Sequence, residues 1–580
     1  MQTLDERTAT LRVATFLASA TGLLLLHFAG LPAFLQAIPL LGFIFFAFLI
    51  WRQDRIRQVL RLFHKRLELG RRQRACAELD WGNIPALPPV LVDKLPRYFS
   101  DLDLIQGHAV LRLVNQTVST RGWARLLSYF DSNAIDAKEM LRRQKTVQEM
   151  ARLQVLRRRF MVTEALWAGL IESDRIEDLL ARPLHTPRAP WFFGLVFAAQ
   201  AAFLGLFAWF ALTAGSPYFM LAGIVLYLTY RRASREVRLL EAYAYGMSVD
   251  VSLGKFSALA EVAGRMSRAG GENLRALLAP FSGERNPRRI LALTGRVVGC
   301  LGVRQNYILH MAVNLLFPWD FFWTLRLEKL RREIHDQMPT WLNTLAEVEV
   351  FLSLAEFCVA HPDYVFPETA EANEPALQAQ GLAHPLIEAS KRVGNDLVLS
   401  KEQRCLVITG SNMSGKSTFL RSIGVNVLLA RSGTVVCARR LRLGPLQLAT
   451  SLRLNDSLEE GLSSFYAEVR QLKRILEHAE AGKPVLYLID EVFRGTNNRE
   501  RLIGSRAYIR RLSATTAFGL VTTHDLELAQ LASENPGIHN FHFKEDFEGD
   551  EMRFHYKLAP GPCPTTNALK VMELAGLPTK

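Results

Sequence analysis

The fold of the C-terminal part is decided by one stretch, Gly410-Ser411-Asn412-Met413-Ser414-Gly415-Lys416-Ser417-Thr418. The apolar residues 406–409 before it are typical of a buried strand, and residues 417–429 after it are typical of a helix. The glycines let the backbone curl so that several N–H groups face one point, where the helix N-terminus adds its positive dipole. Because of this context, the stretch predicts a phosphate-binding loop for ATP rather than a chance glycine turn.

Particular side chains in and after this loop suit phosphate chemistry. Lys416 supplies a point charge for the β- and γ-phosphates, and Ser417 can offer its hydroxyl oxygen to Mg²⁺. A second apolar run, residues 485–489, carries Asp490 to its end, where the carboxylate can also hold Mg²⁺. Glu491 is then placed to polarise the attacking water. The alternative for this element is a buried strand that ends in an acidic turn.

A third strand is expected at residues 518–523, directly before His524. A histidine at the end of a strand can sense the γ-phosphate and the water, although a lone histidine in a turn can also be structural. From Gly381 onward short β-branched runs alternate with helical segments, which favours an α/β domain. We therefore expect an α/β P-loop ATPase domain, ABC-like in class, with Lys416, Glu491 and His524 as its catalytic residues.

Two pairs of apolar stretches precede this domain. Val13–Leu31 and Ala33–Trp51 carry no formal charge, and about 20 such residues cross a bilayer as a helix. Trp191–Thr213 is a further spanning candidate, whereas Tyr218–Tyr230 has only thirteen residues, which is short for a span. We expect two α-helical membrane hairpins. A cleaved signal peptide is the alternative for the first stretch, and buried hydrophobic hairpins are the alternative for each pair.

The distribution of charge predicts an orientation. The chain holds 70 Lys and Arg against 56 Asp and Glu, a net charge of +14 that favours polyanionic partners or a membrane with basic flanks. Residues 52–74 contain nine Lys or Arg and two acids, whereas the two short hairpin connectors are uncharged. The positive-inside rule then places the connectors outside and the rest in the cytoplasm. We expect a multi-pass protein of a bacterial inner membrane, with a cytoplasmic ATPase domain.

Helical periodicity between and after the apolar pairs indicates a lever or stalk. It is clearest in residues 111–161 and 321–357, and Pro339 is expected to break or kink the second of these. Six scattered cysteines form no CxxC pair, so neither a disulfide framework nor a structural metal site is expected. The expected domains are a membrane hairpin (1–51), a basic juxtamembrane helical region (52–103), lever helices (104–190), a second membrane hairpin (191–230), a lever return (231–361), a linker (362–380) and the ATPase domain (381–580).

These motifs together resemble a known family. The run from Ile408 to Arg421, with the Asn412-Met413 pair inside its loop, is similar to the ATPase domain of the DNA mismatch repair MutS family. Further segments that resemble this domain are residues 381–387, 395–397, 490–497, 523–528, 556–558 and 574–578. A weaker resemblance to the family's core lever domain covers residues 115–122, 142–147 and 341–357.

The resemblance implies a homodimer in which each ATPase completes the other's site. The segment 461–468 resembles the family's signature region, so Ser463 would reach the partner's γ-phosphate; a plain surface loop is the alternative. The resemblance also implies DNA as a partner. Family members that detect mismatches use a Phe-x-Glu motif in an N-terminal domain, and here such triplets occur only at 366–368 and 543–545. Mismatch recognition is therefore not expected.

The sequence thus favours a membrane-anchored MutS-like ATPase that uses ATP and Mg²⁺ to drive a dimeric clamp on DNA. The basic segment 52–74 could contact DNA phosphates, but a solvated or lipid-facing helix accounts for it as well. A transport or membrane-remodelling ATPase of the ABC type is the alternative, although the chain has no Leu-Ser-Gly-Gly-Gln signature. A scaffold that binds ATP without hydrolysing it is a third hypothesis.

Overall fold

The computed structural model describes most of the chain in two compact units. The described residues are 2–29, 33–89, 95–131, 136–167, 171–182, 190–213, 221, 225, 239–283, 286–371, 374, 376–411, 413–453, 464–493, 497–548 and 551–563. One unit comprises Met1–Ala75 with Arg158–Ala168, and the other comprises Cys76–Arg157 with Gly169–Lys580.

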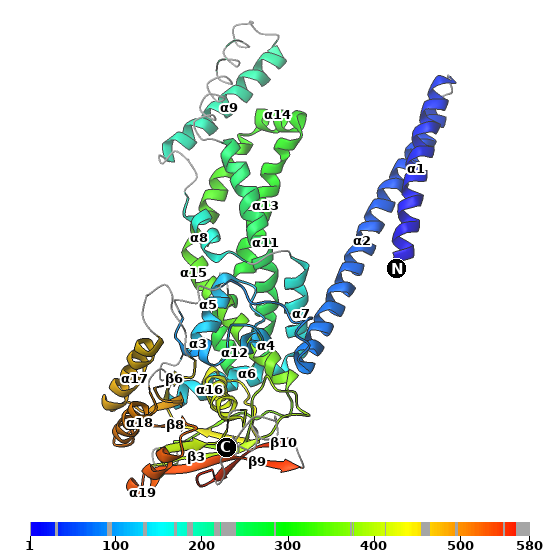
Figure 1. Cartoon of the computed structure of the whole chain (residues 1–580). Coiled ribbons are helices and arrows are strands. Elements are labelled where there is room, and N and C mark those ends of the chain that lie inside the picture. Colours follow the sequence, from blue (N-terminus) through cyan, green and yellow to red (C-terminus); the bar gives the residue numbers. More distant parts are fainter. Residues whose placement is uncertain are drawn as a thin grey trace. The chain divides into compact units, whose positions relative to one another are not determined.

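The first unit contains a helical hairpin. Helices α1 (Gln2–Phe28) and α2 (Ala33–Glu78) run side by side (Figure 1), and α2 continues well beyond the N-terminal end of α1. The Phe16 ring lies 5.9 Å from that of Phe43, and a Cβ atom added to Gly42 would come within 2.0 Å of Ser19 Oγ, so the two backbones approach closely. At the open end, Gln53 donates to the Asp5 carboxylate at 3.0 Å. These contacts confirm a helical hairpin at the N-terminus.

The second unit begins with a series of helices. They are α3 (Tyr98–Asp101), α4 (Val110–Val114), α5 (Thr120–Tyr129), α6 (Ala137–Arg152), α7 (Gln154–Leu166, part of which belongs to the first unit), α8 (Ser173–Ala181), α9 (Pro190–Thr213), α11 (Leu239–Ala269), α12 (Glu272–Leu277), α13 (Pro287–Leu301), α14 (Tyr307–Leu316) and α15 (Trp319–Ala360). The helices α11, α13 and α15 pack against one another, and α5 and α6 pack against α15. The predicted helical region therefore exists, with residues 111–161 divided among four helices.

The long helix α15 corrects one expectation. It runs through Pro339 without ending, so the predicted break is wrong. A proline inside a helix removes one backbone hydrogen bond and crowds the preceding turn, at a cost of about 3 kcal/mol. Here Met338, Trp341 and Leu342 are each 1% exposed, and burying such side chains contributes about 1.5–3 kcal/mol apiece. Packing on both sides of Pro339 offsets the local cost.

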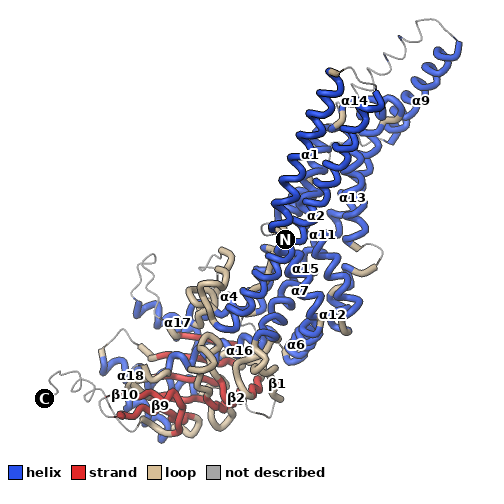
Figure 2. Tube along the Cα trace, turned by 90° about the vertical axis from the view of Figure 1, so that its right-hand side faces the viewer, coloured by secondary structure: helices blue, strands red, loops and turns tan. Residues whose placement is uncertain are grey.

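The C-terminal part contains all the described strands, which Figure 2 draws in red. A six-stranded sheet has the order β10-β9-β4-β8-β7-β6, and a four-stranded sheet has the order β1-β5-β2-β3. The strands are β1 (Glu368–Thr369), β2 (Leu377–Leu382), β3 (Asn395–Leu399), β4 (Cys405–Thr409), β5 (Arg440–Leu443), β6 (Gln447–Ser451), β7 (Val485–Asp490), β8 (Phe518–Thr522), β9 (Ile538–Glu548) and β10 (Glu551–Pro560). The helices among them are α16 (Lys416–Ser432), α17 (Ser464–Glu480), α18 (Asn498–Ser513) and α19 (Leu531–Glu534), with a 3₁₀ turn, η5, at Leu526–Gln530. The expected α/β domain is thus present.

The membrane hairpins are not confirmed by the structure. Among the described residues, one helical segment, Arg7–Leu25 in α1, is long and apolar enough to cross a membrane. The stretch predicted at residues 191–213 forms α9, whose apolar segment Phe197–Trp209 is shorter than a span. The stretch predicted at residues 218–230 lies outside the described residues except for Leu221 and Val225.

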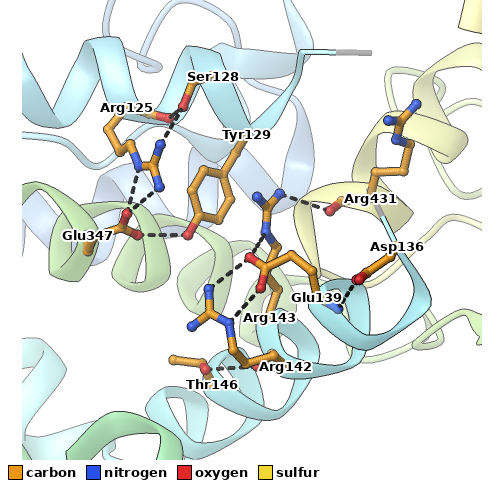
Figure 3. Close-up of polar contacts among 10 residues, drawn as sticks. All are labelled: Arg125, Ser128, Tyr129, Asp136, Glu139, Arg142, Arg143, Thr146, Glu347 and Arg431. Carbon is orange, nitrogen blue, oxygen red and sulfur yellow. Dashed lines mark hydrogen bonds and ion pairs between the residues drawn. The ribbon is translucent and has the colours of Figure 1, made fainter. Parts of the chain in front are cut away.

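Helix α6 of the helical part meets the C-terminal α/β part at the end of α16 (Figure 3). Arg143 on α6 donates from Nη1 to the backbone oxygen of Arg431, in the last turn of α16, at 3.2 Å. A cation at this end complements the helix dipole. The Arg143 guanidinium also lies 3.9 Å from the Tyr129 ring centre, and Tyr129 donates to Glu347 of α15 at 2.7 Å. Burial raises the pKa of Tyr129, which keeps its hydroxyl a donor.

Candidate functional site

Three neighbouring parallel strands bring the predicted site residues to one edge of the six-stranded sheet. Strand β8 lies between β4 and β7, and Thr522 is paired with both Ile408 and Asp490. Because parallel strands end at the same edge, the segments that follow β4, β7 and β8 converge there. The sequence predicted each of these strands and the polar residues after them. The register of the sheet determines how the polar residues are spaced.

The loop after β4 curls as its glycines require. The φ angles of Gly410, Met413 and Gly415 are 147°, 73° and 102°, which lie in the left-handed region that favours glycine. Helix α16 begins at Lys416 directly after the last of these. Met413 is the non-glycine residue among these three, and its side chain is 84% exposed. The loop and the N-terminus of α16 together form the predicted concavity, with Asn412 outside the described residues.

The side chain of Lys416 folds back over this loop. Its Nζ atom donates to the backbone oxygens of Gly410 at 2.6 Å and of Ser411 at 2.7 Å. Lys416 is only 6% exposed, so its ammonium group is held at the loop instead of extending into solvent. Ser414 is also buried, and its Oγ atom has no hydrogen-bond partner in the part of the chain that the structure describes. Thr418 follows in the first turn of α16.

Ser417 and Asp490 lie together, as predicted for two ligands of one ion. Ser417 Oγ donates to Asp490 Oδ2 at 2.7 Å, and the Thr522 hydroxyl donates to Asp490 Oδ1. Hydroxyl and carboxylate oxygens are the ligands that Mg²⁺ prefers. The two oxygens therefore fit a shared Mg²⁺, and Thr522 orients the carboxylate. This supporting role of Thr522 could not be seen in the sequence, because it depends on the pairing of β7 with β8.

Glu491 and His524 are also brought into contact. Glu491 adopts a φ of 57°, and its backbone N–H donates to the oxygen of Thr522 at 3.0 Å, which turns the chain sharply after β7. His524 Nδ1 lies 3.1 Å from Glu491 Oε1. The Glu491 side chain is 23% exposed and that of His524 is 45% exposed. Both groups can therefore meet a solvent molecule or a ligand at the sheet edge.

A cavity of about 620 Å³ opens beside these residues. From the predicted set, its walls include Ser411, Met413, Gly415, Lys416, Ser417, Thr418, Asp490 and Glu491. His524 is not among the lining residues and reaches the cavity only through Glu491. The cavity is large enough for a small organic ligand, whose pockets span about 300–1,000 Å³.

Other walls of the cavity come from segments distant in the chain. Tyr556 on β10 lies over the loop, 3.1 Å from where a Cβ atom on Gly415 would stand. The Asn395 side chain holds this region: its Nδ2 donates to Tyr556 O at 3.0 Å, and its Oδ1 accepts from Leu558 N at 2.8 Å. In the sequence, Asn395 and Tyr556 stand out only as parts of segments that resemble the MutS ATPase domain. Their contact depends on tertiary pairing, so no local pattern signals it.

His384 is a further lining residue that the sequence did not single out as a site residue. It is 6% exposed, and Leu386 N donates to its Nδ1 at 3.2 Å. Burial, with the nearby Arg421 and Arg392 cations, lowers the pKa of His384 to about 4. The imidazole is therefore neutral near pH 7 and presents Nε2–H as a donor.

Glu468 of α17 supports the turn that carries Glu491. It is 2% exposed and accepts a hydrogen bond from Phe493 N at 2.8 Å. Helix α17 begins at Ser464, so Ser463, the residue expected to act in the partner's site, lies outside the described residues. Within the described part of the chain, no cluster of three or more His, Cys, Asp or Glu side chains could hold a structural metal.

Comparison with known proteins agrees with this geometry. A family model described as MutS domain V matches residues 406–580. The DNA mismatch repair protein MutS of Carboxydothermus hydrogenoformans is 33% identical over 285 residues, which cover 47% of this chain and 33% of that relative. The match thus spans about a third of the relative's length. Residues 406–580 therefore match MutS domain V, and the identity to the MutS relative supports a MutS-family protein.

Proposed function

We propose that the protein is a Mg²⁺-dependent ATPase. One observation carries the proposal: the Lys416 ammonium, the Ser417–Asp490 pair and the Glu491–His524 pair lie at one edge of the sheet, beside a cavity of about 620 Å³. These are the parts that phosphoryl transfer from ATP to water requires: a phosphate cradle, a metal site and a base.

The loop and α16 bind the phosphates in this proposal. Backbone N–H groups between Gly410 and Gly415, together with the positive end of the α16 dipole, attract the negative phosphate oxygens. Lys416 exchanges the two loop carbonyls for the β- and γ-phosphates when ATP enters. Asn412, Ser414 and Thr418 belong to the same binding segment. The base and ribose occupy the rest of the cavity, beside His384 and Tyr556.

Ser417 and Asp490 would hold the Mg²⁺ ion, since their oxygens already lie 2.7 Å apart. When bound, the ion neutralises charge on the phosphate oxygens. Glu491 acts as the general base: its carboxylate accepts a proton from the water that attacks the γ-phosphate. His524 contacts Glu491 Oε1 at 3.1 Å and orients that carboxylate toward the water.

A test of the nucleotide site compares two lysines of the same domain. Lys416→Ala is expected to abolish binding of a fluorescent ATP analogue and ATP turnover, because the phosphate charge loses its counter-ion. Lys401→Ala is the control: Lys401 is exposed, and only its backbone oxygen makes a described contact, with Arg404. Nucleotide binding that survives Lys416→Ala would contradict the proposed site.

We further propose that two copies pair and act as a clamp. The matched relative bears the name DNA mismatch repair protein, so DNA is the proposed cargo here too. Ser463 would reach the partner's γ-phosphate, so that closing of the dimer completes both sites. The Arg143–Arg431 contact, drawn in Figure 3, would then transmit movement of α16 to the helical lever. Residues 104–190 and 231–361 form the proposed lever.

Membrane attachment is the third part of the proposal. Large apolar side chains of α1 and α2 are exposed, among them Leu25 at 65%, Phe28 at 84% and Ile44 at 67%. Water disfavours such a surface by about 25 cal/mol per Å², whereas a bilayer accepts it. The hairpin of α1 and α2, and a second one that begins with α9, would anchor the protein and leave the ATPase domain in the cytoplasm.

Two measurements test the DNA and membrane parts separately. Duplex DNA at low salt is expected to raise ATP turnover and to bind the full chain, with affinity that falls as salt rises. If neither turnover nor binding responds, the DNA part is wrong. Flotation of the full chain with neutral phosphatidylcholine vesicles tests the anchor, and recovery of the protein only in the unfloated fraction would exclude it.

A further inference from the structure

A second cavity, of about 510 Å³, lies in the helical part between α13 and the first turns of α15. Its walls are apolar and include Val297 of α13 with Phe322 and Trp323 of α15. Three cations, Arg296, Arg326 and Lys329, line the same groove. We call these three the rim cations. The groove takes no part in the nucleotide site, so the ATPase proposal does not explain it.

The rim cations have no carboxylate partner within the described residues. Among the described residues, the groove lining contains no acidic residue, and none of the three cations forms an ion pair. The nearest acid along α15, Glu328, is already engaged by Arg331 at 2.7 Å and Arg332 at 2.8 Å. The groove therefore combines an apolar floor with uncompensated positive charge, and its complement is a molecule with an apolar part and an anionic group.

Trp323 adds a polar feature to the apolar wall. Its Nε1 atom is buried and has no acceptor in the part of the chain that the structure describes. The neighbouring Trp319, one turn earlier on α15, donates from Nε1 to Cys300 O at 2.8 Å. A buried donor without an acceptor is unfavourable, so an acceptor oxygen from a ligand in the groove would be favoured at the Trp323 indole.

The groove lies beside an uncharged helix. Helix α15 starts at Trp319, shortly after the end of α14, and α9 contacts α14. The rings of Phe197 on α9 and Phe317 lie 5.5 Å apart, and Gln200 donates to Asn314 O at 3.4 Å. Helix α9 has 24 residues and no charge. Tryptophan and basic side chains close to an apolar helix are typical of the membrane–water interface.

We propose that this groove binds one anionic phospholipid. An acyl chain of the lipid would lie against Val297 and Phe322, and the rim cations would hold its phosphate. The proposal rests on the membrane attachment proposed above. Duplex DNA would also meet the rim cations through its phosphates, but it offers no apolar part for the groove. The observations therefore favour lipid over DNA.

The experiment measures the lipid preference of the groove on the full chain in non-ionic detergent. Brominated phosphatidylglycerol and brominated phosphatidylcholine are added in mixed micelles, and tryptophan quenching is followed. The part due to Trp323 is the difference between the unaltered protein and Trp323→Phe. We expect half-maximal Trp323 quenching at a lower mole fraction of phosphatidylglycerol. The double variant Arg326→Gln/Lys329→Gln should weaken that preference by more than the roughly fivefold expected for the loss of one cation.

A matched control and two contrary outcomes make the test decisive. Arg470 and Arg474 are two exposed cations on α17, so Arg470→Gln/Arg474→Gln should leave the preference unchanged. Equal Trp323 quenching by the two lipids would overturn the proposal. So would a duplex oligonucleotide that reverses the quenching and binds less tightly to the Arg326→Gln/Lys329→Gln variant, since the groove would then be a DNA site. Mixed micelles present the lipid whether or not the hairpins insert into a bilayer. A negative result in the flotation or ATPase assay is therefore distinguishable from the absence of lipid binding in the groove.

Discussion

The carboxylate of Asp101 accepts a hydrogen bond of 2.6 Å from the hydroxyl of Thr450, although 349 residues separate the two in the chain. The same carboxylate accepts from the backbone N–H groups of Leu452 and Arg453, each at 3.3 Å. Asp101 ends α3 in the helical part, and Thr450 belongs to β6 of the sheet. The contact therefore joins α3 to the strand that precedes Ser463 in the chain, the residue proposed to act in the partner's site.

Removal of this carboxylate is predicted to destabilise the junction. Asp101 is 1% exposed, so Asp101→Ala would leave the Thr450 hydroxyl and two backbone donors buried without acceptors. We expect the free energy of unfolding to fall by about 1–3 kcal/mol, measured by urea denaturation. Asp174→Ala is the control, because the Asp174 side chain is 90% exposed. Equal losses in the two variants would show that the buried contact is unimportant.

His524 is predicted to affect turnover more than nucleotide binding. Its described contact is with Glu491 Oε1, and it does not line the cavity. His524→Ala should lower kcat about 10- to 100-fold, because a misplaced base loses alignment with the water. The dissociation constant for ATP should stay unchanged, and His524→Asn, which keeps a donor, should recover part of the rate. The opposite pattern, weaker ATP binding with an unaltered kcat, would remove His524 from its proposed role.

Glu349 is predicted to make stability depend on pH. It lies on α15, fully buried, and its Oε2 accepts from Val118 N, Ser119 N and Ser119 Oγ, each at 3.0 Å. A Cβ atom on Gly122 would come within 1.9 Å of that oxygen, so the chain at α5 leaves room only for glycine. Burial raises the pKa of Glu349 from 4.5 to about 7. The folded protein therefore holds a proton on Glu349 that the unfolded chain releases.

The direction of the effect follows from this proton. The contribution of Glu349 to stability is complete below pH 4.5 and is lost as the pH rises through about 7. Glu349→Gln keeps an oxygen for the three donors and does not titrate. Between about pH 5 and pH 8 we expect the unaltered protein to lose about 1–3 kcal/mol more of its unfolding free energy than the variant does. Parallel pH profiles of urea unfolding for the two proteins would contradict the assignment.

The parts of the fold that could be predicted from the sequence are those with local causes. The apolar runs before Gly410, Asp490 and His524 are strands β4, β7 and β8, because short β-branched runs bounded by turn residues favour buried parallel strands. Positive φ angles at Gly410 and Gly415 likewise follow from the residue type. The sheet-edge half of the site was thus predictable, residue by residue.

Features with non-local causes could not be predicted. The contacts of Asn395 with Tyr556 and Leu558 depend on how β3 and β10 come together, and 161 residues separate Asn395 from Tyr556. The helix through Pro339 shows the same limit, since tertiary packing offsets a local cost that sequence rules treat as decisive. The groove beside Trp323 depends on two helices that are close in space, so periodicity alone does not reveal it.

ATP turnover of Glu491→Gln decides whether Glu491 is the base of an ATP-hydrolysing site. The amide preserves the shape of the side chain but cannot accept the proton of the attacking water. We expect Mg²⁺-ATP to bind as it does to the unaltered protein and turnover to be at least about 100-fold slower, so that ATP stays bound intact. Glu477→Gln, which alters an exposed carboxyl of the same domain, should leave turnover unchanged. Turnover by Glu491→Gln at the rate of the unaltered protein would contradict the account.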